Sequence, residues 1–460
     1  MDSPDPIQFI DTHCHLEMEQ FDGDRDEMIR RARTAGVGTM ITVGSDLESV
    51  AKAIELSGND DNIFAAVGVH PHEARHVDEN VCRRLSAWAS HPKVVAIGET
   101  GLDYHYDHSP RDVQMSVFRK HLELASDAGL PVIIHCREAW DDTIRILKES
   151  GNSRGVLHCF SGNRNMAAEV ISLGYHVSVA GPVTFRKAAD LREVARLVPD
   201  EYLLLETDAP YLSPEPYRGK RNEPAFLVHT AHFIAGLRGI SLEDIARITT
   251  LNARRLFSIG QVSEHAEIAY RIRDSLYLNI TNRCTNACTF CVKFQTDYVK
   301  GHNLRLDHEP SEEEVREAIG DPSRYKEIVF CGYGEPLSRL DIVKGIASWV
   351  KRQHGRVRVN TNGQANLIHK RKIIPELQGL VDSISISLDA QDEETYVKIC
   401  KPVFPDAFQE ILQFIREAKE VIPDVRVTVV ALEGVDIEKC RSIAEDLGVG
   451  FTVRALDVVG

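Results

Sequence analysis

Short apolar runs alternate with longer amphipathic stretches along the whole chain. In the first half, amphipathic stretches such as Val113–Ala128 and Trp140–Ser150 carry apolar residues every three or four positions, which predicts helices. The apolar runs between such stretches predict eight strands, Gln8–Asp11, Gly38–Val43, Ile63–Val69, Val94–Ile97, Val132–His135, Gly155–His158, His176–Val179 and Tyr202–Leu205. Eight strand–helix units in about 255 residues are typical of an α/β fold, the TIM-type (β/α)8 barrel.

The mostly polar stretch Gly260–Asp274 ends this pattern. We predict that it links a first domain, residues 1–259, to a second, residues 275–460. Six further strands are predicted there, Ser275–Ile280, Glu327–Cys331, Arg356–Asn360, Ser383–Leu388, Val425–Ala431 and Phe451–Leu456. Six strand–helix units favour a smaller α/β domain, a partly open parallel (β/α)6 barrel. The sequence ends close to the sixth strand, so a last helix is not predicted.

Composition and charge agree with a multidomain globular protein. The chain has 460 residues, of which 43% are hydrophobic and 27% charged. Apolar runs such as Val132–Ile134 fall far short of the roughly 20 residues that cross a bilayer, so we expect no membrane association. The N-terminus lacks a basic region followed by an apolar one, and we expect a cytoplasmic protein. A net charge of −15 gives no overall attraction to nucleic acid, so such a substrate would have to be held locally.

Six potential metal ligands follow or end the predicted strands of the first domain. They are His13, His15, Glu99, His135, His158 and Asp208. Alternate residues of a strand point the same way, so His13 and His15 can face one point. A lone histidine at a strand end is usually a polar rim residue, but six such ligands at matching ends predict a metal site.

Six ligands exceed the three that one catalytic zinc ion takes, so two divalent ions of the Mg, Mn or Zn class are expected. Glu99 is the natural bridge, because a carboxylate has two oxygens. Asp208 could bind one ion and accept the proton of the attacking water, so Glu99 and Asp208 are the predicted catalytic residues. Such a pair of ions suits the hydrolysis of a phosphodiester.

Several residues near these ligands are predicted to contact substrate. Arg218 and Lys220 lie in a basic loop after the eighth strand, where TIM barrels often bind phosphate. A solvated surface loop would have the same charge. His70 and Tyr104 are expected to line the pocket, although His70 could equally be a rim histidine.

The segments DTHCHLE, VGVHPHE, IGETGLDYH, VIIHCREAW, HCFSG and ETDAPYLSP resemble those of the TatD family of metal-dependent deoxyribonucleases, over roughly residues 7–258. The resemblance implies His13, His15, Glu99 and Asp208 on one ion, and Glu99, His135 and His158 on the other. It also implies an exonuclease-like attack on DNA. The acidic composition argues against a long nucleic-acid groove, so a strand end or a nucleotide-like substrate is expected.

Three cysteines, Cys284, Cys288 and Cys291, crowd into eight residues after the first strand of the second domain. Three thiolates in a short loop can hold an iron–sulfur cluster and leave one iron open. Zinc is the competing interpretation, but a structural zinc site generally needs four ligands, and the nearest later cysteine is Cys331.

This C-x3-C-x2-C spacing resembles the signature of the radical S-adenosylmethionine superfamily, over roughly residues 275–456. The resemblance implies a 4Fe–4S cluster, S-adenosylmethionine, an electron donor such as flavodoxin or ferredoxin, and reductive cleavage to a 5′-deoxyadenosyl radical. It also implies contacts to the cofactor from the residues that follow the later strands, Gly332, Gly334, Glu335, Asn360, Ser385 and Ser387. The sequence leaves the substrate of this radical open.

Three hypotheses therefore compete. In the first, both domains are enzymes and the first domain is a nuclease. In the second, the first domain is an amidohydrolase-like enzyme that shares a pathway with the second domain and acts on a small metabolite or modified nucleotide. In the third, one domain is a scaffold without chemistry. The third is weakened because no proposed ligand is missing from either site.

Overall fold

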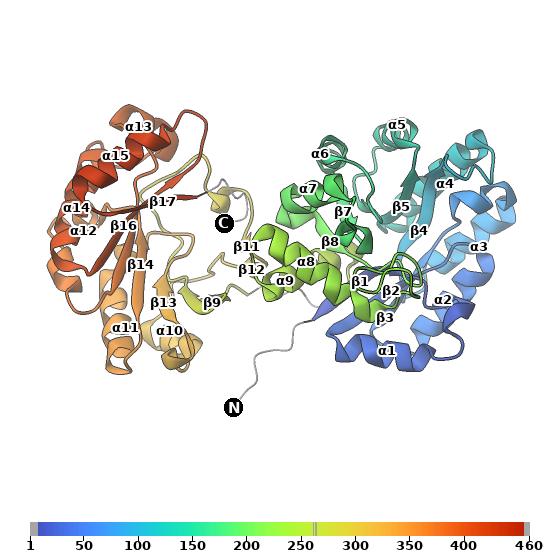
Figure 1. Ribbon diagram of the computed structural model, residues 1–460, viewed down its shortest axis with the longest axis horizontal. Coiled ribbons are helices and arrows are strands. Elements are labelled where there is room, and N and C mark those ends of the chain that lie inside the picture. The colour runs from blue at the N-terminus through green and yellow to red at the C-terminus, as the bar shows by residue number, and fades with distance from the viewer. Residues whose placement is uncertain (1–7, 261, 263–264, 455–460) are drawn as a thin grey trace. The chain divides into compact units, whose positions relative to one another are not determined.

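The computed structural model describes residues 8–260, 262 and 265–454. The chain divides into two compact units, Met1–Val262 and Ser263–Gly460 (Figure 1). Each unit has its own hydrophobic core, and each is described by itself below.

The first unit is a parallel barrel whose strands follow one another in sequence order. The strands are β1 (Phe9–Cys14), β2 (Val37–Val43), β3 (Ile63–Val67), β4 (Val94–Asp103), β5 (Val132–Arg137), β6 (Gly155–Leu157), β7 (His176–Val179) and β8 (Leu203–Leu205). A backbone bridge between Cys14 and Ala209 joins the first strand to the segment after the last. The predicted (β/α)8 barrel is confirmed.

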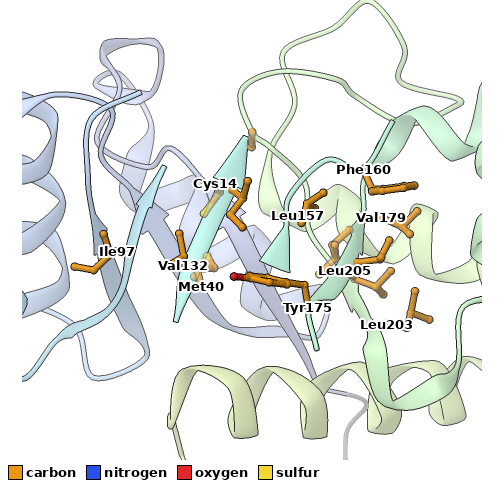
Figure 2. Packing of buried hydrophobic residues seen from close by; sticks show 14 of the residues in the cluster. Cys14, Met40, Ile97, Val132, Leu157, Phe160, Tyr175, Val179, Leu203 and Leu205 are labelled. Atoms are coloured by element: carbon orange, nitrogen blue, oxygen red, sulfur yellow. The ribbon is translucent and has the colours of Figure 1, made fainter. Parts of the chain in front are cut away.

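Nine α-helices accompany these strands within the described part of this unit. They are α1 (Arg25–Thr34), α2 (Leu47–Gly58), α3 (Glu79–Ala89), α4 (Arg111–Ala128), α5 (Trp140–Ser150), α6 (Arg164–Ser172), α7 (Ala189–Leu197), α8 (Leu227–Arg238) and α9 (Leu242–Phe257). Strand residues that point outward pack against the helices, and Figure 2 shows several of them, including Met40, Val132 and Leu205.

Strand residues that point inward form a second cluster with α9. Asn252 of α9 donates hydrogen bonds to the carbonyls of Asp200 and Leu203, and Thr250 donates one to Gln8. These acceptors lie just before or at the start of their strands. The helix therefore covers the N-terminal end of the barrel and leaves the C-terminal end for a site.

Strand β4 is six residues longer than predicted, so Glu99 lies inside the strand rather than after it. Gly98 and Gly101 lie inside it with φ angles of 145° and 138°, a region that favours glycine. A Cβ atom at Gly101 would lie 2.0 Å from the carbonyl oxygen of His135 on β5. These glycines thus allow the two strands to continue side by side.

The second unit contains a mixed seven-stranded sheet in the order β17-β16-β15-β14-β13-β10-β9. Its strands are β9 (Ala269–Ile272), β10 (Ser275–Leu278), β13 (Glu327–Phe330), β14 (Val357–Thr361), β15 (Ser383–Ser387), β16 (Asp424–Val430) and β17 (Gly450–Arg454). The last six are parallel and correspond to the six predicted strands, of which the end of the sixth, residues 455–456, lies outside the described residues.

Strand β9 differs from the prediction, because it lies within the stretch predicted as a linker. It pairs antiparallel with β10 through a tight turn, and Tyr270 and Tyr277 are register partners in this pair. The run Ala269–Ile272 alternates weakly and contains an arginine, so its sequence looks polar, but Tyr270 is buried. The sheet is therefore mixed rather than purely parallel.

Helices cover one face of this sheet. They are α10 (Glu312–Ile319), α11 (Leu340–Arg352), α12 (Ala365–His369), α13 (Glu393–Cys400), α14 (Ala407–Val421) and α15 (Ile437–Leu447), and a small hairpin is formed by β11 (Tyr298–Val299) and β12 (His302–Asn303). Ile328, Val359, Ile384 and Val427 point toward the helices and are fully buried. The alternate residues of the same strands are mostly polar and form the opposite face.

Among the described residues, no single helix is long and apolar enough to span a membrane. The bent pair Pro224–Arg238 and Leu242–Phe257, at 110° to each other, meets the length and composition criteria only when both helices are taken together.

The separate cores predict that the two units respond separately to core mutations. Phe118 and Phe414 are each fully buried, in the first and second core respectively. Phe414→Ala should lower the free energy of unfolding of the second unit by about 3–5 kcal/mol, and Phe118→Ala that of the first. Hydrogen exchange followed by mass spectrometry measures both units in one sample. Faster exchange in both units from either mutation would contradict this independence.

Candidate metal centre and cysteine loop

The closure of the barrel brings three predicted ligands together. The backbone amide of Asp208 donates to the carbonyl of His13 at 2.9 Å, and the amide of His15 donates to the carbonyl of Ala209 at 2.8 Å. The Nε2 atoms of His13 and His15 are 3.4 Å apart, and Asp208 Oδ1 lies 3.7 Å and 3.4 Å from them. Both imidazoles are buried.

Glu99 lies between this group and a second one. Its Oε2 is 3.6 Å from Nε2 of His13, whereas its Oε1 is 2.8 Å from Nδ1 of His135 and 2.7 Å from Nε2 of His158. Each carboxylate oxygen therefore faces a different set of imidazoles. This is the arrangement expected of a carboxylate that bridges two ions.

Neighbouring groups fix which imidazole nitrogens carry lone pairs. His15 Nδ1 lies 2.7 Å from the carbonyl of Val43, to which it can only donate, so its Nε2 is left as an acceptor. His135 Nε2 lies 3.1 Å from Oδ2 of Asp103, so its Nδ1 faces Glu99. Acceptors that converge on one buried point repel each other unless a cation lies between them. The residues thus fit divalent metal ions.

The carboxyl groups are in the charged form that metal ions bind. Burial by itself would raise the pKa of Glu99, but the surrounding imidazoles, His158 foremost, hold it well below its usual range. Burial also opposes ionisation of Asp208, but the hydrogen bond from His15 and the charges of His13, His158 and His15 together lower its pKa.

Three sets of ligand atoms lie within 4.8 Å of one another in the described residues, all in this unit. They are His13–His15–Glu99, His70–Glu99–His135 and His13–His158–Glu206. His70, predicted to contact substrate, thus lies within ligand distance, with its Nε2 3.5 Å from Glu99 Oε1.

Sequence reasoning missed Glu206 and Asp103. Glu206 is buried, and its Oε1 lies 3.5 Å from Nδ1 of His158. Asp103 accepts from both His72 and His135 at 3.1 Å. A signal existed for each: Glu206 precedes Asp208 by two residues, and Asp103 follows Glu99 by four, so in extended chain each pair shares a face.

The other predicted substrate residues lie around the rim. The hydroxyl of Tyr104 donates a hydrogen bond to Asp142 of α5 at 2.7 Å, and Arg111 of α4 lies over the tyrosine ring. Tyr104 therefore already contacts two helices. Arg218 and Lys220 are exposed and lie over the rings of Phe185 and Tyr217.

Sequence reasoning singled out neither of two exposed tyrosines: Tyr211 contacts a proposed ligand, and Tyr106 contacts His72, which bonds to Asp103. Tyr106 is 51% exposed, stacks parallel to His108 and contacts the edge of His72. Tyr211 is 47% exposed, and its ring meets that of His15 at 6.1 Å between centroids. Polar imidazoles thus line the centre, and flat aromatic surfaces flank it.

In the second unit, the three cysteines lie in the loop that follows β10 and are partly exposed. The amide of Asn286 and the side-chain nitrogen of Asn362 point at Cys284 Sγ, at 3.4 Å and 3.8 Å. Among the described residues these thiols form no set of ligand atoms within 4.8 Å. Three thiols in one short loop, with two nitrogen donors directed at one of them, fit the thiolate ligands of an iron–sulfur cluster.

The predicted cofactor residues after β13 pack against this loop. A Cβ atom at Gly334 would lie 2.4 Å from the carbonyl of Arg283, and one at Gly332 would lie 2.2 Å from Asn279. The glycines therefore permit close approach of the chain to its own cysteine loop. Glu335 is buried and accepts hydrogen bonds from the hydroxyl of Thr361 and from the backbone amide of Asn362. Because the side chain of Asn362 points at Cys284, Asn362 links Glu335 to the cysteine loop. Burial raises its pKa to about 7.

The remaining predicted cofactor residues share the polar face of the sheet. Asn360 and Ser385 are register partners on β14 and β15, and Ser387 lies two residues further along. Asn360 accepts from Arg358 at 2.9 Å, and the hydroxyls of Ser387 and Thr428 are 3.5 Å apart. The structure thus places these residues on one face, and their contact with a cofactor stays a prediction.

Comparison with known proteins identifies relatives of each unit. Residues 10–258 match the model of the TatD related DNase family, and residues 278–447 match that of the Radical SAM superfamily. These families imply divalent metals in the first unit, and a 4Fe–4S cluster with S-adenosylmethionine in the second.

The relatives of the first unit are similar over nearly their whole length. The uncharacterized metal-dependent hydrolase YabD of Bacillus subtilis is 45% identical over 253 residues, which are 55% of this chain and 99% of YabD. A 3′-5′ ssDNA/RNA exonuclease TatD of a Rahnella species is 40% identical, over 54% of this chain and 97% of that protein. The crystal structure of YJJV, a TatD homolog of Escherichia coli K12, matches with a TM-score of 0.53 and 33% identity, over 55% of this chain and 99% of that one. The chain belongs to the TatD family of metal-dependent hydrolases, and its TatD unit is fused to a radical SAM domain.

Proposed function

We propose that the first unit is a two-metal phosphodiesterase that removes nucleotides from the end of a nucleic-acid strand. The observation that carries this proposal is the position of Glu99, whose two carboxylate oxygens face different imidazoles. Two ions held in this way supply an activated water and stabilise the leaving oxygen of a phosphodiester.

The residues of the chain have separate tasks in this reaction. Asp208 lies beside His13 and His15 and can accept the proton of the attacking water. His135 is held in orientation by Asp103, and His15 by the carbonyl of Val43. Such partners fix the ligands before substrate arrives, so the site needs little rearrangement.

The rim supports a strand end as substrate. Tyr211 exposes a flat ring beside His15, and unpaired bases stack on such rings regardless of sequence. Arg218 and Lys220 are exposed cations that can bind backbone phosphates. The relative from Rahnella is described as an exonuclease on single-stranded DNA and RNA, which agrees with this proposal.

For the second unit we propose reductive cleavage of S-adenosylmethionine, with Cys284, Cys288 and Cys291 holding the cluster. The three thiols lie within eight residues of one loop, and Asn286 and Asn362 donate toward Cys284, which supports this proposal. A cluster held by three cysteines keeps one iron open, and the cofactor supplies the radical chemistry. The polar face with Asn360, Ser385 and Ser387 would bind the rest of the cofactor.

We expect Asp208→Asn to lower hydrolysis of a single-stranded oligonucleotide by roughly 10²–10⁴-fold, because the amide cannot accept the proton. Gel analysis of an end-labelled strand with Mg²⁺ or Mn²⁺ measures the loss. Asp190→Asn, at an exposed carboxylate on α7, is the control and should keep full activity. Wild-type cleavage by Asp208→Asn would contradict the proposed role. A wild type that hydrolyses amides but not oligonucleotides would favour the amidohydrolase-like alternative.

Asp103→Asn should weaken metal binding rather than abolish it. Loss of the carboxylate removes the acceptor that orients His135, and such partners contribute roughly 10–100-fold to metal affinity. Titration of the metal-free protein with Mn²⁺ measures this change. Asp107→Asn is the matched control, because Asp107 is exposed and pairs with Arg111. Equal affinities of the two variants would exclude a positioning role for Asp103.

Cys288→Ala should abolish release of 5′-deoxyadenosine from S-adenosylmethionine by the anaerobically reconstituted protein, and should lower its iron content. Cys82→Ala removes a thiol from the first unit and serves as the control for cysteine number. Mass spectrometry of the product and iron analysis provide the two measurements. Identical product from wild type and Cys288→Ala would refute the assignment.

A further inference from the structure

The segment that ends α13 runs antiparallel to the cysteine loop. The amide of Thr289 donates to the carbonyl of Ile399 at 2.9 Å, and in the opposite direction the amide of Val403 donates to the carbonyl of Thr285 at 2.9 Å. Between these two hydrogen bonds the segments form an antiparallel bridge. The loop that carries the three cysteines is therefore paired with residues 399–403.

The register of this pairing sets a fourth cysteine opposite one of the three. Asn286 is the bridge partner of Pro402, so Cys288, two residues further along the loop, faces Cys400, two residues back. Opposite residues of antiparallel segments that do not bond to each other hold their Cα atoms about 4.5 Å apart. A disulfide spans Cα distances of roughly 4.4–6.8 Å, so the backbone permits one here.

Buried side chains hold the same register. The side-chain amide of Asn286 donates to the hydroxyl of Tyr396, one turn before Cys400 on α13, at 2.9 Å. The side-chain amide of Gln364 donates to the side-chain oxygen of Asn286 at 2.7 Å and to the same hydroxyl at 2.9 Å. All three residues are buried. Cys288 and Cys400 are therefore held opposite each other by backbone and side chains together.

The two thiols differ in exposure. Cys400 is fully buried in the core of the second unit, whereas Cys288 is partly exposed and packs against that core. The hydrogen bond between the two side chains, and then burial, raise the pKa of the Cys400 thiol. A buried, protonated thiol reacts slowly with oxidants in water. Oxidation of this pair therefore begins at Cys288.

We propose that Cys400 is the resolving cysteine of the cysteine loop, which traps an oxidised Cys288 as a reversible Cys288–Cys400 disulfide whenever the loop holds no cluster. The oxidant is a peroxide. The proposal rests on the proposed cluster, because it assigns to the disulfide the task of keeping Cys288 fit to bind iron again.

The reaction has two balanced steps. The thiol of Cys288 attacks one oxygen of hydrogen peroxide, the O–O bond breaks, and a sulfenic acid and one water are formed. The thiol of Cys400 then attacks this sulfur, the S–S bond replaces the S–O bond, and a second water leaves with the thiol proton. Two thiols are oxidised and one peroxide is reduced. Without a resolving thiol, further peroxide converts the sulfenic acid to a sulfinic acid, which is not reversed by thiol reductants.

The first measurement detects the bond in the full-length wild-type chain before reconstitution. After brief treatment with hydrogen peroxide and alkylation of free thiols, tryptic digestion without reductant should give residues 284–293 linked to residues 399–416. Fragmentation of the linked peptides should place the link at Cys288, and dithiothreitol should release both peptides. A disulfide within residues 284–293, or oxidised Cys288 without a link, would overturn the proposal.

The second measurement compares recovery from peroxide. Wild type that is treated, reduced with dithiothreitol and reconstituted anaerobically should regain the iron content of untreated protein. Cys400→Ser should bind iron normally before peroxide, and afterwards should lose most of its iron content and carry sulfinic acid at Cys288. Cys400→Ala repeats the comparison with an apolar side chain, in case serine disturbs the buried position.

Cys440→Ser is the matched control, because Cys440 is also a fully buried helix cysteine of this unit. It should recover as wild type does. Equal recovery of Cys400→Ser and wild type would refute the resolving role.

Failure of the cluster assignment gives a different result. A wild type that binds no iron even before peroxide would refute the proposed cluster, and the task of the disulfide with it. Normal iron binding without the linked peptide would refute the cysteine pair alone.

Discussion

Two backbone hydrogen bonds between β1 and the segment after β8 determine the first site. They join Asp208 to His13 and His15 to Ala209, and they close the barrel where the ligands lie. Without this closure, Asp208 would be separated from the histidines by the full length of the barrel sequence. The site is thus a consequence of the fold rather than an addition to it, because its first and last ligands meet only if all eight strands pair in order.

Glu99 depends on that closure in turn. A buried carboxylate without a cation is costly, and the imidazoles that face its two oxygens come from three different strands or strand ends. Because Val43 and Asp103 direct lone pairs of His15 and His135 inward, the group is assembled to bind positive charge. Divalent ions satisfy both requirements, which is why the geometry supports hydrolysis and not only packing.

The sequence predicted both α/β units, and the structure brings its six candidate ligands together, because each lies near the end of a short apolar run that periodicity detects. It failed where local sequence and tertiary pairing disagree. The predicted strand ends at Ile97, yet the observed strand continues to Asp103 because Gly98 and Gly101 fit against β5. The polar run that contains β9 becomes a strand only because β10 offers an edge. The spacing of Asp103 from Glu99 and of Glu206 from Asp208 is a weak signal in the sequence, but the contacts of both residues are with histidines more than 30 residues away.

The two sites differ in exposure, and their chemistries explain the difference. His13, His15, Glu99 and His158 are almost completely buried, which strengthens the interaction of such residues with metal ions. The three cysteines are partly exposed, even though burial would protect a cluster bound by their thiolates. A hydrolase needs only its substrate and water, whereas reductive cleavage needs an electron from outside the chain. Exposure at the cysteine loop therefore follows from the chemistry proposed for it, since a fully buried cluster could not meet a protein donor.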